Sequence, residues 1–111
     1  MYDYAFSLRS PGTKRSGSSF TYAELRAVFN KGLRKPGFDA DEYRLDGCGA
    51  LMKFSEYGIR TRGNCGWEID HIYPVSKGGS DDLSNLQPLQ WQNNASKSDG
   101  PNYAFCEVQR Q

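Results

Sequence analysis

The sequence has few of the residues on which metal knuckles and cross-linked scaffolds are built. It holds one histidine and three cysteines in 111 residues, and the cysteines, Cys48, Cys65 and Cys106, form no C-x-x-C pair. Zinc knuckles need paired cysteine spacing, and disulfide frameworks use an even number of cysteines. We therefore expect reduced, structural thiols, and a link between Cys48 and Cys65 stays open.

Long apolar runs are missing as well. The mean hydropathy is -0.76, and no stretch approaches the roughly 18 to 20 apolar residues of a membrane-spanning helix. The N-terminal stretch MYDYAFSLRS lacks the basic start and apolar centre of a signal peptide. These absences predict a cytoplasmic protein without a membrane partner, and export as a toxin by another route stays open.

The net charge of +1 hides two unlike parts of the chain. Residues 1–62 hold 11 Lys and Arg against 7 Asp and Glu, a balance of +4, whereas residues 63–111 hold 3 against 6, a balance of -3. A basic part suits a polyanion such as DNA, because phosphate contacts come mainly from Lys and Arg. Ordinary variation of surface charge is the alternative.

The length predicts one domain preceded by a short arm. A chain of this size supports a single core, which we assign to residues 20–111. Residues 9–19, RSPGTKRSGSS, combine Pro, Gly, Ser and basic side chains without apolar periodicity. Residues 1–19 are therefore expected to form a flexible basic arm. Such an arm either follows a phosphate backbone or is only a solvated tail.

The first half of the domain predicts a helix and a hairpin. Thr21 with Glu24 three residues later is a capping-box pattern, and Gly32 is placed to end the helix. A second short helix is expected in FDADEYR, residues 38–44, followed by two short strands around the turn Asp46-Gly47. The apolar stripe that predicts the buried face of the first helix is Tyr22, Leu25, Val28 and Phe29.

The last third of the chain predicts the order strand, loop, strand, helix. WEIDHI, residues 67–72, is expected to be a strand that Pro74 stops, and LQPLQ, residues 86–90, a second short strand or an extended piece. WQNNASKSD, residues 91–99, predicts a short helix closed by Gly100-Pro101. Trp67 is expected to pack rather than to stack on a base. The other residues assigned to the core are Ile69, Ile72, Leu83, Leu86, Leu89 and Trp91.

This order of elements carries polar residues that resemble those of the HNH endonuclease family. The resemblance covers residues 67–99, and several residue types must coincide at several spacings to produce it. The third letter of the family name is Asn94 here, a variant that the family contains. The matching residues are Asp70-His71-Ile72, Pro74, Gly78-Gly79, Asn85-Leu86, Leu89, Asn94 and Lys97.

The resemblance implies a ββα-metal site, or His-Me finger, over residues 66–99, in which two strands and a helix enclose one divalent cation. In such a site His71 is the general base that deprotonates the attacking water. Asn85 braces the loop that orients His71, and Asp70 and Asn94 supply oxygen ligands to the metal.

Elementary chemistry supports the same roles. Hydrolysis of a phosphodiester needs a base for water and stabilisation of the charge on the phosphate, and an imidazole exchanges protons near neutral pH. Because Asp70 and Asn94 offer oxygen and no sulfur, Mg²⁺ or Mn²⁺ is favoured over Zn²⁺. Adjacent strand residues point to opposite faces, so Asp70 and His71 are not expected to ligate the same ion.

Basic and polar residues around this set are assigned supporting roles. Lys97 and Ser98 share a helix face with Asn94. Lys97 is therefore placed to contact a phosphate, with a merely solvated side chain as the alternative. Ser98 is expected to approach the metal through a water molecule. The resemblance implies that Glu68 fixes a neighbouring basic side chain, for which Arg60 and Arg62 are the candidates. The residues assigned to DNA or phosphate binding are Lys97, Lys77, Arg60 and Arg62.

One departure from the family concerns zinc. Many members hold a structural zinc with two C-x-x-C pairs, but the positions expected for the second pair are Gln90 and Asn93 here, and only Cys65 stands near the first. We predict a version without structural zinc, whose motif is braced by residues 20–60 instead.

The sequence thus predicts a small single α+β domain, with the ββα-metal motif in its C-terminal half and an N-terminal helix plus a short hairpin. The predicted function is hydrolysis of DNA by an endonuclease that uses one Mg²⁺ or Mn²⁺ ion, as a monomer or a homodimer. Two other functions stay open. One is a DNA-binding module of the same fold without cleavage, and the other is a structural domain whose cysteines hold zinc.

Overall fold

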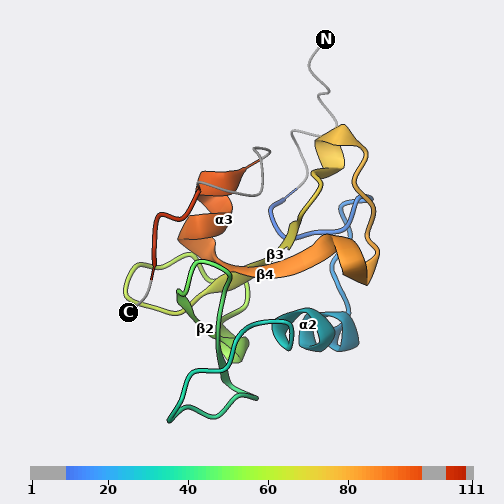
Figure 1. Ribbon diagram of the computed structural model, residues 1–111. Coiled ribbons are helices and arrows are strands. Elements are labelled where there is room, and N and C mark those ends of the chain that lie inside the picture. The colour runs from blue at the N-terminus through green and yellow to red at the C-terminus, as the bar shows by residue number, and fades with distance from the viewer. Residues whose placement is uncertain (1–9, 99–104, 110–111) are drawn as a thin grey trace.

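The computed structural model describes residues 10–98 and 105–109. These residues form two small antiparallel sheets and two α-helices, with α3 and α2 on opposite sides of the β3–β4 pair (Figure 1). The predicted α+β class is confirmed. The elements are α2 (Tyr22–Phe29), β1 (Tyr43–Leu45), β2 (Leu51–Lys53), η1 (Phe54–Glu56), β3 (Trp67–His71), η2 (Val75–Lys77), η3 (Leu83–Asn85), β4 (Leu86–Gln90) and α3 (Trp91–Lys97).

Strand β3 is buried along its whole length, and its two faces differ in chemistry. Trp67 and Ile69 point to one side, where Phe29 of α2 contacts Trp67 with ring centroids 5.0 Å apart. Glu68 and Asp70 alternate with them and so point to the other side, where α3 lies. The strand therefore separates an apolar layer from a charged one.

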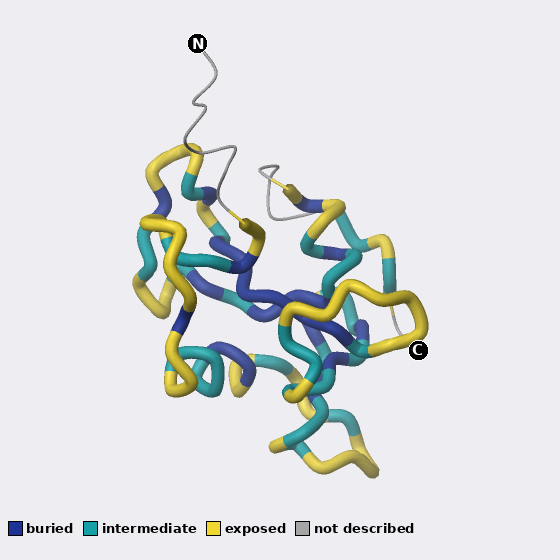
Figure 2. Tube along the Cα trace, turned by 180° about the vertical axis from the view of Figure 1, so that it is seen from behind, coloured by how far each residue is buried: buried dark blue, intermediate teal, exposed yellow. Residues whose placement is uncertain are grey.

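The apolar layer is the core of the domain. Buried segments run through the middle of the molecule along β3 and β4 (Figure 2). The residues of this core are Phe20, Val28, Phe29, Met52, Trp67, Ile69 and Leu86, and Leu89 is also buried. The prediction that Trp67 packs is confirmed.

Two residues assigned to the core are exposed. Tyr22 is 68% exposed and Leu83 is 49% exposed. Tyr22 is the first residue of α2, and its ring makes a T-shaped contact with that of Phe54. Leu83 lies in η3 on the connection between the strands. The core prediction was wrong for both, because periodicity alone does not show where an element leaves the core.

Helix α2 begins as predicted and ends earlier than predicted. The Thr21 side chain accepts from the N–H of Glu24, and the Glu24 carboxylate accepts from the N–H of Thr21, which completes the capping box. Asn30 rather than Gly32 caps the C-terminal end. Gly32 instead allows the chain to approach Arg44, since a β-carbon there would lie 2.9 Å from the Arg44 Cβ.

The second helix predicted for residues 38–44 is absent from this described stretch. The backbone N–H groups of Glu42 and Tyr43 both bond the Asp39 carbonyl, which makes a single turn, and the chain then enters β1. Pairing of β1 with β2 extends the backbone from Tyr43 and prevents the turn from continuing. The predicted hairpin around Asp46-Gly47 is confirmed.

The buried carboxylate of Asp46 joins this hairpin to the C-terminal half. Its Oδ1 accepts from the N–H groups of Cys48 and Ala50, both at 2.9 Å. Its Oδ2 accepts from the Gln90 N–H and the Asn93 Nδ2, both at 3.0 Å. Gln90 and Asn93 are the positions at which the second zinc-binding cysteine pair was expected, so hydrogen bonds to Asp46 connect them to the hairpin.

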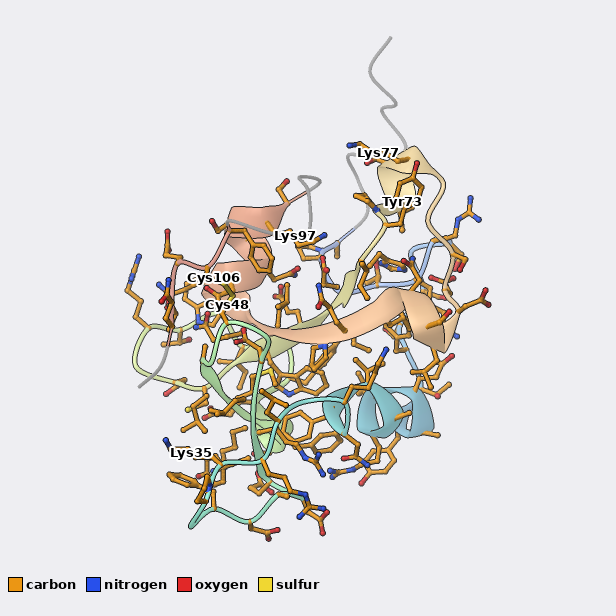
Figure 3. The ribbon with its side chains drawn as sticks, viewed as in Figure 1. Lys35, Cys48, Tyr73, Lys77, Lys97 and Cys106 are labelled. Atoms are coloured by element: carbon orange, nitrogen blue, oxygen red, sulfur yellow. A yellow bond between two sulfur atoms is a disulfide. The ribbon has the colours of Figure 1, made fainter. Side chains whose placement is uncertain are left out.

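The prediction that all cysteines are reduced was wrong. Cys48 and Cys106 form a disulfide across 58 residues (Figure 3), and Cys65 is the free thiol. Asn93 brings the two partners together, because its Oδ1 accepts from the N–H groups of Glu107 and Val108 at 2.8 and 2.7 Å. The alternatives of a Cys48–Cys65 link and of zinc held by these cysteines are excluded by the same bond.

The N-terminal segment contacts the domain where it is described. The Tyr57 hydroxyl donates to the Gly12 carbonyl at 2.7 Å, and burial raises the pKa of Tyr57 to about 12, so the hydroxyl keeps its proton. The Arg15 N–H lies 3.2 and 3.3 Å from the two carboxylate oxygens of Asp81. The flexible arm over residues 1–19 stays a prediction, because residues 1–9 lie outside the described part. Among the described helices, none is long and apolar enough to cross a membrane.

We predict that the disulfide contributes about 2–4 kcal/mol to the free energy of unfolding, because it constrains a long loop of the unfolded chain. Cys106→Ser should lower that free energy by this amount in urea denaturation, and reductant should lower the wild type to the same value. Cys65→Ser is the matched control and should change little. Equal stability of Cys106→Ser and the oxidised wild type would contradict the prediction.

Candidate active site

The charged face of β3 meets α3 through two pairs of side chains. Glu68 is 4% exposed; its carboxylate accepts from Arg60 Nε and Nη2 at 2.6 and 2.7 Å and from Asn94 Nδ2 at 2.6 Å. Of the two candidate partners of Glu68, the structure pairs Arg60 with it and leaves Arg62 exposed. This hydrogen bonding raises the pKa of Arg60.

Asp70 forms the second pair, one step further along the strand. Its Oδ1 lies 3.2 Å from Lys97 Nζ, and its Oδ2 accepts from Gln87 Nε2 at 2.9 Å. Burial raises the pKa of Asp70, while the hydrogen bond from Gln87 and the charge of Lys97 act in the opposite direction. Both side chains of this ion pair are buried, so the ammonium group of Lys97 already balances the charge of Asp70 within the protein.

Lys97 is therefore not solvated, and that alternative was wrong. Its ammonium also donates to the His71 carbonyl at 3.2 Å, and its side chain has no exposed surface. Figure 3 shows Lys97 extending from α3 toward the strands, whereas Lys77 lies at the far end of the loop between β3 and β4. The phosphate contact of Lys97 stays a prediction.

His71 is the last residue of β3 and has different neighbours from Asp70. Its Nε2 lies 2.8 Å from Asp81 Oδ1, and its ring lies 6.2 Å from the Phe20 ring, tilted by 39°. The side chain is 5% exposed. Asp70 and His71 thus face separate sets of residues, as expected for neighbours on one strand.

Asn85 holds the two ends of the loop that follows His71. Its Oδ1 accepts from the Tyr73 N–H at 2.8 Å, and its Nδ2 donates to the carbonyls of Tyr73 and Ser80 at 3.1 and 2.8 Å. Its backbone carbonyl accepts from the Ile72 N–H. These bonds are the geometry that a loop brace requires.

The two glycines of the loop are needed for its shape. Gly78 closes η2 with a φ of 95°, in the left-handed region that favours glycine. A β-carbon on Gly79 would collide with the Tyr73 carbonyl. The loop that follows His71 can fold back on itself because Gly78 and Gly79 have no side chains.

The remaining predicted residues lie around this centre. Lys77 is exposed in η2, and Arg62 is exposed in the turn before β3. Ser98 is exposed and caps α3, where its N–H donates to the Asn94 carbonyl. The predicted helix closure at Gly100-Pro101 lies outside the described residues.

Sequence reasoning missed Asp81 and Gln87. Gln87 pairs with Asp70 across the two strands, so the register of β4 against β3 would have revealed it. Asp81 stands beside a second aspartate in a loop without periodicity, and no pattern distinguishes the two. Only the folded loop shows which carboxylate reaches His71.

The α3 side carries oxygen atoms of the kind that bind hard divalent cations. Within the described residues, no three His, Cys, Asp or Glu side chains gather closely enough to hold a metal ion. A cation here would rely on the carboxylate of Asp70 and the amide oxygen of Asn94, with Glu68 beside them, and such donors suit Mg²⁺ or Mn²⁺. The existing pair between Asp70 and Lys97 would have to rearrange around it.

Strands β3 and β4 pair antiparallel, and helix α3 crosses one face of the pair, so the three elements form a ββα unit. An acidic residue and a histidine end the first strand of this unit, and its helix carries an amide side chain. The family model described as HNH endonuclease matches residues 48–100, so this segment is similar to HNH endonucleases, as its sequence pattern predicted. Comparisons with curated proteins and with solved structures gave no significant match. This match supports a nuclease-type function; the HNH family generally uses a divalent metal and acts on DNA.

We predict that Arg60 stabilises the domain through Glu68. Arg60→Ala should lower the free energy of unfolding by about 1–3 kcal/mol, because it leaves a buried carboxylate with fewer partners. Arg62→Ala removes the same charge from an exposed position and should stay within about 0.5 kcal/mol of the wild type. Urea denaturation of both variants measures the difference, and equal losses would show that the pair with Glu68 contributes nothing.

Proposed function

We propose that this protein is a metal-dependent endonuclease that hydrolyses phosphodiester bonds of DNA. The observation that supports it most is the placement of Asp70 and His71 at the end of β3, with Asn94 on the helix that crosses the strand. The match of residues 48–100 to the HNH family model supports the same reaction class.

His71 acts as the general base in this proposal. It accepts a proton from the water that attacks the phosphorus, and its low exposure limits competing contacts with bulk water. Asn85 keeps the following loop closed by its bonds to Tyr73 and Ser80. The base thus acts from a fixed position at the end of the strand.

Asp70 and Asn94 hold the cation, Mg²⁺ or Mn²⁺. When bound, that ion stabilises negative charge on the phosphate and on the leaving oxygen. Glu68 orients Asn94, because its carboxylate accepts from the Asn94 amide nitrogen and so directs the amide oxygen away from itself. Lys97 balances the charge of Asp70 when no metal is present.

Exposed basic residues bind the DNA backbone. Lys77 and Arg62 are both exposed, and contacts of this kind give salt-sensitive affinity with little sequence preference. Arg60 has a smaller part in binding, because Glu68 already engages its guanidinium.

A DNA-binding module that has lost cleavage is the second candidate. The contact between Lys97 and Asp70 favours it, because an ammonium group already lies where a cation would bind. The two candidates differ in one observable: the inactive module would bind plasmid DNA and leave it supercoiled with Mg²⁺ or Mn²⁺.

We predict that the purified protein nicks supercoiled plasmid with Mg²⁺ or Mn²⁺ and that EDTA stops it. His71→Ala should slow cleavage by about 100- to 10,000-fold, the contribution typical of a general base, with DNA affinity retained. Asn94→Ala should raise the Mn²⁺ concentration needed for half-maximal cleavage. Initial rates on agarose gels and DNA affinities by fluorescence anisotropy provide the measurements.

Ser96→Ala is the matched control on the exposed side of the same helix and should cleave like the wild type. If His71→Ala nicks at the wild-type rate, the assignment of the base is wrong. If the wild type binds plasmid but never nicks it, the inactive module is correct.

A further inference from the structure

Asp81 is the carboxylate nearest to the proposed base. Its Oδ1 lies 2.8 Å from His71 Nε2. The same carboxylate accepts from the backbone N–H of Arg15 at 3.2 and 3.3 Å. Asp81 comes from the loop between β3 and β4, and Arg15 from the N-terminal segment, so three parts of the chain meet at the Asp81 carboxylate.

The hydrogen bond determines which ring nitrogen carries the proton. An ionised carboxylate only accepts, so a neutral imidazole bonded to it carries its proton on Nε2. The other ring nitrogen, Nδ1, then has a free lone pair and is the atom that accepts a proton from water. Without a partner on Nε2, either nitrogen can carry the proton.

The ring is also restrained in its orientation. The Phe20 ring lies against it, and the His71 backbone is paired with Leu86 of β4. Strand pairing fixes the position of the His71 backbone, and the Phe20 ring restricts the space for the imidazole. The bond to Asp81 fixes the side-chain torsion angles of His71. A carboxylate at this distance is the group that can hold a base in one orientation.

We propose that Asp81 is the positioning residue of His71, holding its Nε2–H so that Nδ1 faces the attacking water. This inference rests on the proposed nuclease function for its catalytic consequence, but the hydrogen bond itself can be tested without any activity.

The N-terminal segment supports Asp81 through a turn. The Gly17 N–H donates to the Lys14 carbonyl at 2.7 Å, which places Arg15 at the second position of a β-turn. Its N–H points to Asp81 and not into the turn. Arg15 therefore acts through its backbone, so Arg15→Ala should preserve the bond. Arg15→Pro should remove it, and proline is favoured at this position of a turn.

The neighbouring Asp82 provides a matched control. It is exposed, and it forms no side-chain bond to the N-terminus of η3. Asp82→Ala changes the net charge by the same amount as Asp81→Ala, one residue away. A difference in cleavage rate or in the imidazole N–H signal between the two variants therefore arises from the contact with His71. The change in net charge is the same in both.

Proton NMR tests the contact directly, because His71 is the only histidine in the chain. The wild type and Asp82→Ala should show one downfield imidazole N–H resonance that exchanges slowly with water. Asp81→Ala should lose it, Asp81→Glu should restore it in part, and Arg15→Pro should speed its exchange relative to Arg15→Ala. Persistence of the resonance in Asp81→Ala would overturn the proposal.

Single-turnover cleavage of plasmid tests the consequence. Asp81→Ala should lower the rate by about 10- to 100-fold with unchanged DNA affinity and unchanged circular dichroism, Asp81→Glu should recover part of the rate, and Asp82→Ala should match the wild type. A higher rate in Asp81→Ala, or equal losses in both alanine variants, would overturn the positioning role. An inactive wild type that still shows the protected N–H would refute the nuclease proposal and leave the hydrogen bond established.

Discussion

The alternation of side chains along β3 is the constraint on which the other parts of the structure depend. Trp67 and Ile69 enter the apolar core beneath α2, while Glu68 and Asp70 point to α3. Because successive strand residues face opposite sides, a slip of one residue would place two carboxylates in the core. The same register that forms the core therefore also delivers the acidic residues to the helix, and leaves His71 at the end of the strand.

The charged layer needs support from outside the ββα unit, and Asp46 provides it. Its carboxylate bonds the start of α3 and the β1–β2 turn at once. Asn93 extends this connection to the C-terminal segment, where Cys106 is linked to Cys48. A buried carboxylate, an amide and a disulfide thus connect the hairpin, the start of α3 and the C-terminal segment. The predicted brace by residues 20–60 agrees with the position of Asp46.

Much of this arrangement was predictable because it is local in sequence. The capping box of α2 involves residues three apart, and the two strands and the helix after Gln90 follow from alternation and apolar spacing. The proximity of Glu68 to Arg60 was also predictable, since the two residues lie eight positions apart in the sequence.

The parts that could not be predicted depend on contacts between distant residues. Nothing near Cys48 indicates a partner 58 residues away, and the helix face of Lys97 does not reveal that Asp70 lies opposite it. Asp81 could be distinguished from Asp82 only after the loop was folded by Asn85, Gly78 and Gly79. Helix propensity over residues 38–44 was overruled by strand pairing.

The central claim is that the face shared by β3 and α3 is a cation site. Titration of the isotope-labelled protein with Mn²⁺, followed by two-dimensional amide NMR, tests it most directly, because the paramagnetic ion broadens the signals of nearby groups. The account predicts that signals of residues 68–71 and 94–97 broaden first and that Asp70→Asn abolishes this preference. Broadening that begins at the exposed acidic turn around Asp39 and Asp41, or that is unchanged in Asp70→Asn, would contradict it.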